Sequence, residues 1–223
     1  MSITKNLVNL KKSLPNNVEL VLVSKTRSNE QILEAFKIGQ INFGENKVQE
    51  LVSKHEKLPK DIKWHMIGHL QRNKVKYISK FIHLIHTVDS IKILKEIDKR
   101  AKIDHRIIDC LLQIKIAKEE NKFGFKHEEI DKIITISKEL KNIQIRGLMG
   151  MATNTNDSTL VKKEFDLISL IHKKYYSEIF NILSIGMSSD YKIAILNNSN
   201  MIRVGSAIFL SLIHISEPTR LGF

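Results

Sequence analysis

Short apolar runs alternate with amphipathic stretches along the whole of this 223-residue chain. Within the amphipathic stretches, apolar side chains recur every three or four residues, which is the spacing of one helix face. The short runs are continuously apolar, as strands of a parallel sheet with a covered outer face are. Strands are therefore expected at residues 18–24, 41–43, 62–67, 81–88, 106–116, 143–149, 179–185 and 201–204.

The alternation of eight strands with about eight helices indicates an α/β fold with a parallel sheet. A barrel of eight β/α units takes about 200–250 residues, which suits the length of this chain. The pattern therefore predicts a single (β/α)8 barrel of the TIM type in preference to an open doubly wound sheet. The amphipathic stretch at 2–14 predicts an extra N-terminal helix. No linker or internal repeat divides the chain, so residues 1–209 are expected to form one domain.

Composition narrows the cellular setting and the partners. The single cysteine, Cys110, lies in an apolar run, and a lone buried thiol fits a reducing compartment. The N-terminus has no apolar signal core, and no run approaches the roughly 18 residues of a membrane span. We therefore expect a cytoplasmic protein without a membrane partner. The net charge of +12 would suit nucleic acid, but the lysines are scattered and only 6% of residues are aromatic, so this partner is the weakest alternative.

Two expected loops carry a pattern typical of phosphate binding. Residues 186–188 follow the seventh strand and residues 205–206 follow the eighth, and each loop offers a glycine and a hydroxyl group. The loops after these two strands often bind phosphate in such barrels. The first loop also precedes an expected helix, whose N-terminus favours anions. Alone, each loop is better explained as a helix cap or a bend, whereas together they favour a phosphate site.

Lys25 follows the first expected strand, at the carboxyl end where a barrel of this kind places its active face. Most lysines at such positions are solvated charges. Inside a barrel mouth, however, a neutral lysine amine can attack a carbonyl carbon and form a Schiff base. A phosphorylated aldehyde would meet Lys25 at one end and Ser188 and Ser206 at the other. Pyridoxal 5′-phosphate is such a molecule.

Several longer motifs occur in order between residues 18 and 209. They are Val23-Ser-Lys25-Thr, Phe43-Gly-Glu-Asn46, Trp64-His-Met-Ile-Gly68, Leu70-Gln-Arg-Asn-Lys74, Gly147-Leu-Met149, Ser184-Ile-Gly-Met-Ser188-Ser-Asp190 and Arg203-Val-Gly-Ser206-Ala-Ile-Phe209. Together they resemble the pyridoxal phosphate homeostasis protein family, also called YggS/PROSC-type proteins. That family is similar in fold to the N-terminal barrel of alanine racemase.

The resemblance implies which residues hold pyridoxal phosphate. It places Lys25 at the Schiff base and Asn46 in the motif that lines the pocket near the cofactor ring. It places Ser188, Gly205 and Ser206 at the phosphate, where Ser206 keeps the hydroxyl of a threonine that is frequent in the family. No catalytic residue is carried over.

Arg203 stands where the family has an arginine close to the pyridine nitrogen. A guanidinium stays protonated and does not readily give its proton to the ring, so the ring would be a poor electron sink. The implied function is therefore cofactor binding and homeostasis, as a carrier or regulator that could serve apo-enzymes, rather than firm catalytic turnover. The alternative is a pyridoxal-phosphate-dependent racemase of the alanine racemase type, as a monomer or weak dimer in either case.

A racemase also needs a second acid/base group on the opposite face of its substrate, and alanine racemase uses a tyrosine from another domain. The four tyrosines of this chain all fall in expected helices. Residues 210–223 depart from the family pattern, and we expect this tail not to be native to the family. His65 and His69 have the spacing of a zinc helix, but the glutamate of that motif is missing, so no metal is expected.

Overall fold

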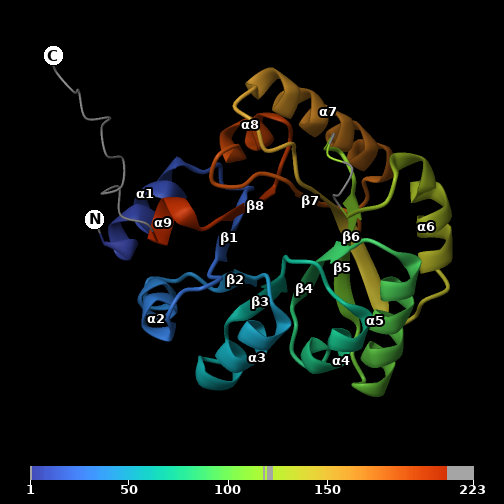
Figure 1. Ribbon diagram of the computed structural model, residues 1–223, viewed down its shortest axis with the longest axis horizontal. Coiled ribbons are helices and arrows are strands. Elements are labelled where there is room, and N and C mark those ends of the chain that lie inside the picture. Colours follow the sequence, from blue (N-terminus) through green and yellow to red (C-terminus); the bar gives the residue numbers. More distant parts are fainter. Residues whose placement is uncertain (1, 118, 120–122, 210–223) are drawn as a thin grey trace, which may run out of the picture.

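Eight parallel strands form a closed barrel in the computed structural model, which describes residues 2–117, 119 and 123–209 (Figure 1). Each strand pairs with the next one along the chain, and β8 pairs with β1 to close the ring. The prediction of a single (β/α)8 barrel is confirmed. The strands are β1 (Glu19–Val23), β2 (Asn42–Glu45), β3 (Lys63–Met66), β4 (Leu84–Val88), β5 (Ile108–Ile114), β6 (Ile143–Gly150), β7 (Ile182–Ser184) and β8 (Met201–Val204).

Helices surround the barrel on its outer side (Figure 1). Between the strands lie α2 (Asn29–Lys37), α3 (Val48–Lys57), α4 (Val75–Ile78), α5 (Ile91–Ile103), α6 (Ile130–Ser137), α7 (Ser158–Tyr175) and α8 (Tyr191–Leu196). Short 3-10 turns, η1 (Arg72–Lys74) and η2 (His127–Glu129), precede α4 and α6. The expected N-terminal helix is α1 (Ile3–Ser13), and a short helix, α9 (Ser206–Phe209), follows β8.

The ends of α2 illustrate how the local sequence sets element boundaries. Before the helix, the Ser28 hydroxyl accepts a hydrogen bond from the backbone N–H of Gln31, whose side chain accepts one from the Ser28 N–H. This capping box satisfies two backbone donors that a helix start leaves free. After the helix, Gly39 adopts φ +82°, a conformation that costs glycine little. The chain can therefore turn directly into β2.

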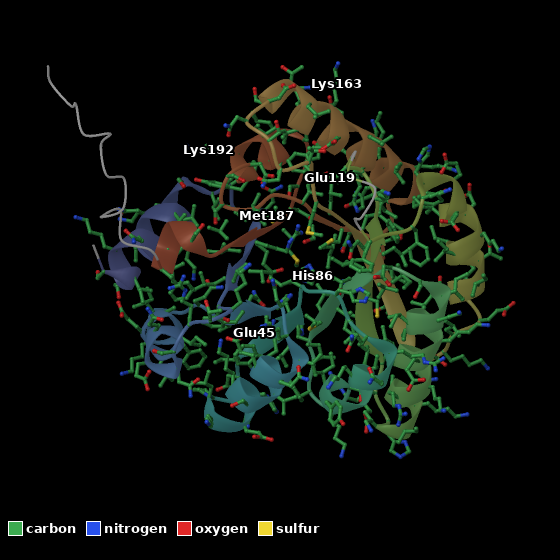
Figure 2. All side chains as sticks on the ribbon, in the orientation of Figure 1. Glu45, His86, Glu119, Lys163, Met187 and Lys192 are labelled. Carbon is green, nitrogen blue, oxygen red and sulfur yellow. The ribbon has the colours of Figure 1, made fainter. Side chains whose placement is uncertain are left out.

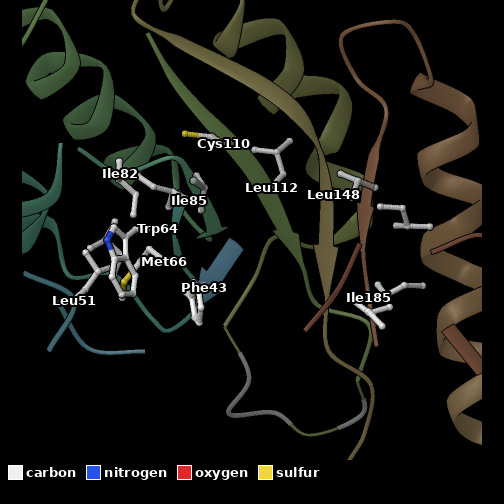
Figure 3. Close-up of a cluster of buried hydrophobic side chains, with 14 of the residues drawn as sticks. Phe43, Leu51, Trp64, Met66, Ile82, Ile85, Cys110, Leu112, Leu148 and Ile185 are labelled. Carbon is white, nitrogen blue, oxygen red and sulfur yellow. The ribbon is translucent and has the colours of Figure 1, made fainter. Parts of the chain in front are cut away.

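The main hydrophobic core lies between the barrel and its helices (Figure 3). It receives alternate strand residues, such as Trp64 and Met66 on β3, because successive side chains of a strand point to opposite faces. Both side chains are fully buried, as is Leu51 on α3. Each of these large side chains contributes about 1.5–3 kcal/mol by leaving water.

The inside of the barrel is filled differently. A separate apolar cluster there takes one residue from each of five strands: Val21, Leu84, Leu111, Met149 and Met201. Buried polar residues also point inward, since their strand neighbours belong to the outer core: His65, His86, Ser184 and Arg203. Figure 2 places His86 near the middle of the ring of strands. Buried polar groups cost free energy unless they are hydrogen-bonded, so this interior requires a connected set of partners.

Several strand limits differ from the sequence-based expectations; β4, for example, begins at Leu84 and not at residue 81. β2 continues through Gly44 and Glu45, because the chain stays hydrogen-bonded to β3 up to Glu45. β7 is three residues long, although a run over 179–185 was expected. The helix expected after residues 186–190 is present, and α8 begins at Tyr191. Strand pairing decides the strand limits, and it is not visible as apolar periodicity.

In the part of the chain that the structure describes, no helix is long and apolar enough to cross a membrane. Residues 210–223, expected to be a tail foreign to the family, lie outside the described residues.

Candidate functional site

A cavity of about 480 Å³ lies at the carboxyl ends of β1, β2, β7 and β8. All six residues predicted to bind the cofactor line it: Lys25, Asn46, Ser188, Arg203, Gly205 and Ser206. Its other lining residues are Val23, Thr26, Arg27, Ile67, Met151, Met187 and Ser189. The volume is in the range of small-molecule sites. The structure therefore brings together residues from both ends of the sequence, as the barrel prediction required.

Arg203 forms the floor of this cavity on the β8 side and is 3% exposed. One of its nitrogens, Nη1, donates to the backbone oxygen and the hydroxyl of Ser184, both at 2.7 Å. Nη2 donates to the Gly150 oxygen at 3.0 Å. Burial lowers the pKa of Arg203 to about 10, against the opposing effect of the Asp190 charge, so the side chain remains a cation at neutral pH. Within the described residues, its Nε–H and one Nη2–H have no protein acceptor.

The loops after β7 and β8 meet at Gly205. The Gly205 N–H donates to the Ser188 hydroxyl at 3.3 Å, which ties the two loops together. A Cβ atom at Gly205 would lie 2.7 Å from the Val23 oxygen and 2.9 Å from the Val23 Cβ, so only glycine fits against β1. Ser206 is exposed at the start of α9 and lines the same cavity. The hydroxyl groups of Ser188 and Ser206 can both donate to an anion.

Asp190 gives the loop after β7 its shape. Its carboxylate accepts a hydrogen bond from the Met187 N–H at 2.5 Å, and its own N–H donates to the Met187 oxygen. Gly186 adopts φ +98°, and a Cβ there would lie 2.7 Å from the Cβ of Ala194 on α8. The loop is therefore held against α8 by a carboxylate and a close packing contact. The helix predicted after residues 186–188 is present as α8, and the loop before it reaches the cavity.

Lys25 follows β1, the strand that pairs with the Arg203 strand β8, and it is exposed at the same cavity. Among the described residues, its amine has no hydrogen-bond or ion-pair partner. The next residue, Thr26, adopts φ +61°, which is uncommon for a threonine, and its N–H donates to the Glu50 carboxylate at 2.7 Å. The turn that carries Lys25 is thus fixed through its backbone, whereas the lysine side chain is left free to move.

A buried lysine supports this turn from below. Lys54 on α3 donates to the Ser24 oxygen at 2.7 Å and pairs with the carboxylates of Glu45 and Glu50 at 2.8 and 2.6 Å. Burial raises the pKa of Glu45, and the hydrogen bonds from Lys54 and Ser24 partly oppose that rise. Glu45 directly precedes the cavity residue Asn46 along the chain, so its carboxylate could have faced the cavity as well. It is instead fully buried within β2 and serves to hold Lys54 and Ser24.

The two histidines with zinc-like spacing point to different places. His65 is buried inside the barrel, where it contacts His86, whereas His69 is exposed and pairs with Asp89 at 2.9 Å. Across residues 2–117, 119 and 123–209, no group of three or more histidine, cysteine or acidic side chains could hold a metal ion.

Sequence reasoning missed the apolar side of the cavity and the support behind Arg203. Ile67, Met151 and Met187 line the cavity at or just beyond strand ends, and a strand-end rule would have found them as well. No sequence pattern indicates the partners of Arg203. Ser184 belongs to another strand, and in the sequence it resembles any other buried serine. Their assignment needs the register of the closed barrel.

The residues present fit a phosphorylated aromatic aldehyde. Ser188 and Ser206 offer hydroxyl donors beside Gly205, and Lys25 offers an amine at another place. Arg203 presents unpaired N–H groups from a buried position, where an acceptor atom of a ring could be recognised. Ile67 and Met151 supply apolar surface for the ring itself.

Comparison with known proteins gives the family. The family described as "Alanine racemase, N-terminal domain" matches residues 1–212. A protein of Helicobacter pylori named pyridoxal phosphate homeostasis protein is 39% identical over 199 residues, which cover 86% of this chain and 87% of that protein. The protein of the same name from Vibrio alginolyticus is 35% identical, with 87% of each chain covered. The chain belongs to the pyridoxal phosphate homeostasis protein family.

Solved structures agree with this family assignment. PipY of Synechococcus elongatus PCC7942, solved without pyridoxal phosphate, is 32% identical and has a TM-score of 0.89, covering 93% of this chain and 100% of that one. The structure of PipY with pyridoxal phosphate bound has a TM-score of 0.84 over the same shares. Alanine racemase of Clostridium difficile 630 is 16% identical, with a TM-score of 0.73 over 93% of this chain and 56% of the racemase, and shows a common fold alone.

Proposed function

We propose that this homeostasis-family protein binds pyridoxal 5′-phosphate through a Schiff base at Lys25 and acts as a carrier or regulator of that cofactor. The observation that carries the proposal is the meeting of Lys25, Arg203 and Gly205 in one cavity of about 480 Å³. The names of the two relatives and the structure of PipY with pyridoxal phosphate bound support it.

Each wall of the cavity would hold one part of the cofactor. Ser188, Ser206 and the backbone at Gly205 would take the phosphate, and Arg203 would donate to the ring nitrogen. Asn46 would lie beside the ring. The aldehyde supplies the covalent link: the Lys25 amine adds to its carbon, water leaves, and a C=N bond remains.

The same residues argue against efficient racemisation. Arg203 is a cation whose Nη1 hydrogens are both committed to Ser184, so it can orient a ring nitrogen but does not readily protonate it. None of the four tyrosines lines the cavity. Tyr175, for example, donates to Asp131 on α6 instead. A second acid/base group on the opposite face of a substrate therefore has no candidate among these tyrosines.

An absorption spectrum tests the covalent assignment. Purified protein mixed with pyridoxal phosphate should show the visible band of a Schiff base, and Lys25→Ala should abolish it. Lys47→Ala is the matched control, because Lys47 is also exposed and close to Asn46 but does not line the cavity. Persistence of the full band in Lys25→Ala would show that another lysine forms the link.

Two assays then separate the carrier from the racemase. Transfer of bound cofactor to an apo-enzyme, followed by recovery of that enzyme's activity, would favour the carrier. Interconversion of D- and L-alanine by the loaded protein, lost in Lys25→Ala, would favour the racemase instead.

A further inference from the structure

A row of buried hydrogen bonds leads from Arg203 into the barrel, away from the cavity. Arg203 Nη1 donates to the Ser184 hydroxyl at 2.7 Å, and that oxygen lies 3.0 Å from Nδ1 of His86. Nε2 of His86 lies 2.9 Å from Nδ1 of His65. The rings of both histidines are fully buried, and they come from the adjacent strands β3 and β4.

The row ends at the opposite mouth of the barrel. Nε2 of His65 lies 3.1 Å from Oδ1 of Asn42, and the Asn42 amide nitrogen donates to the Glu19 carboxylate at 2.6 Å. Glu19 is the first residue of β1 and is exposed. Six side chains from six different strands thus connect a buried cation below the cavity to a carboxylate at the far end.

The chemistry of Glu19 and Asn42 fixes the direction of every bond in the row. A carboxylate only accepts, so the Asn42 amide nitrogen must face Glu19 and the Asn42 oxygen must accept from His65. A neutral His65 then carries its proton on Nε2 and accepts on Nδ1. His86 must accordingly donate from Nε2 and accept on Nδ1 from the Ser184 hydroxyl.

The other end of the row agrees with this direction. Arginine only donates, and the Ser184 oxygen, whose hydrogen is committed to His86, still has lone pairs to accept from Arg203. Burial holds the pKa of His65 and of His86 well below the usual value for histidine. The positive charges of Arg203 and Lys63, and protonation of the neighbouring His83 or of the other ring of the pair, lower these pKa values in the same sense. Both rings are therefore neutral.

We propose that Ser184, His86 and His65 are positioning residues that hold the Arg203 guanidinium toward the cofactor, in a one-way chain of donors that ends on Glu19. The proposed role toward the cofactor rests on the proposed function above, whereas the direction of the chain does not. Reversal of the chain would require Arg203 to lose a proton and Glu19 to gain one, which runs against the acidity of the two groups. The chain is thus a support and not a proton path.

The direction of the chain has a consequence for Arg203. Each member donates away from the cavity, so the dipoles of the hydroxyl, both rings and the amide present their negative ends to the cation. A fully buried guanidinium needs such stabilisation, because taking a charge out of water is costly. The row of hydrogen bonds fixes the Nη1 group of Arg203 on Ser184. It leaves the Nε–H without a protein acceptor among the described residues.

Nitrogen NMR of the cofactor-free protein tests the direction. With the side chain of histidine labelled, both His65 and His86 should give neutral rings protonated on Nε2 between about pH 6 and about pH 8. An imidazolium at either position, or a ring protonated on Nδ1, would overturn the proposal. Because no cofactor is present, this result stands or falls independently of the proposed function.

Substitutions at Ser184 test the support of Arg203. Ser184→Ala removes the link to His86 and should raise the dissociation constant of pyridoxal phosphate about fivefold, the effect of one lost hydrogen bond. It should also shift the pH midpoint at which the absorbance of the bound cofactor titrates. Ser184→Thr keeps the hydroxyl and should restore both values. Equal affinities and midpoints in wild type and Ser184→Ala would overturn the positioning role.

A second variant pair separates this effect from general loss of stability. His86→Phe interrupts the chain, whereas His172→Phe replaces another buried histidine, which packs against Tyr176 and Phe180 outside the barrel. Only His86→Phe should weaken cofactor binding and shift the titration. If His86→Phe does not fold, the Ser184 pair and the wild-type NMR result still decide the proposal.

Discussion

The two sides of the cavity are built in different ways. The β8 wall, formed by Ser188, Arg203 and Gly205, is half-buried or buried and joined by hydrogen bonds within itself. The β1 wall, formed by Lys25 and Asn46, is more open, and the Lys25 amine has no partner in the part of the chain that the structure describes. A rigid wall suits recognition of a fixed shape. A free amine suits a covalent bond that has to form and be broken again.

The difference fits a protein that holds a cofactor and gives it up. In the proposed function, rigid donors would recognise the phosphate and ring at low entropic cost, because their positions are already set. The amine of Lys25 can approach or leave the aldehyde without any change in the β8 wall, since only its backbone turn is fixed, through Thr26 and Glu50.

The largest expected effect is the difference in stability between a variant of the β8 wall, Arg203→Met, and a variant of the β1 wall, Lys25→Met. Arg203→Met leaves the Gly150 oxygen and the Ser184 oxygen without their donors, so we expect a loss of about 3 kcal/mol or more in the free energy of unfolding. Lys25→Met should change it by less than about 0.5 kcal/mol, because the side chain is exposed. Urea denaturation of both variants measures this. Similar losses would mean that the two walls do not differ in stability.

The second largest effect is expected from acid, which should lower the free energy of unfolding through His65 and His86, the buried histidines behind the β8 wall. Below about pH 6.5 the unfolded chain protonates its histidines, whereas His65 and His86 stay neutral when folded because burial lowers the pKa of both. The free energy of unfolding should therefore fall with decreasing pH, by up to about 1.4 kcal/mol per pH unit for each histidine. Glu45, whose pKa is raised by burial, opposes this loss as pH falls.

The measurement compares urea denaturation at neutral pH with denaturation near pH 5.5, in wild type and in His86→Phe. The variant lacks one of the two buried histidines, so its free energy of unfolding should fall less between neutral pH and pH 5.5. A fall equal to that of wild type would indicate that other groups are responsible.

The third largest effect is expected from a side chain introduced at Gly205, where the backbone of β1 lies close. Gly205→Ala places a Cβ against the Val23 oxygen and should cost about 1–3 kcal/mol of stability, together with weaker cofactor binding. Gly39→Ala is the matched control: its φ of +82° makes alanine unfavourable, but the space around it is open and it lies away from the cavity. The control should lose stability without losing affinity. Unchanged affinity in Gly205→Ala would remove Gly205 from the phosphate site.

The smallest expected effect separates two neighbouring serines. Ser188→Ala deletes the acceptor of the Gly205 N–H and the proposed donor to the phosphate, so the dissociation constant should rise about five- to tenfold. Ser189 lines the same cavity but is exposed, and Ser189→Ala should change the constant less than twofold. Fluorescence titration with pyridoxal phosphate resolves such a difference. The reverse order would place the phosphate nearer α8.

Much of this architecture was predictable because it follows from periodicity. The spacing of apolar runs predicts eight strands, and the strand-end rule of barrels places Lys25, Asn46 and Arg203 at one face, where the structure has them. The extent of β2 was not predictable, because Glu45 reads as a loop residue until Lys54 on α3 is seen to pair with it.

The support behind Arg203 was beyond sequence reasoning for a related reason. Ser184, His86 and Asn42 are far apart along the chain, and each has an ordinary reading by itself as a buried hydroxyl, a core histidine or a strand-end amide. Only the strand register places their polar atoms within hydrogen-bond distance of one another. The propensity of a residue carries no information about such distant partners.

The pairing of β1 with β8 also determines when the cavity can form during synthesis. The seam brings Val21 beside Arg203, and the Asn6 side chain on α1 donates to the Ile208 oxygen on α9. During synthesis Lys25 leaves the ribosome early. The residues of the β8 wall leave it only after seven further strands have been made. A nascent chain therefore has no ligand pocket until β8 has emerged and closed the ring, so capture of the ligand reports that the barrel is complete.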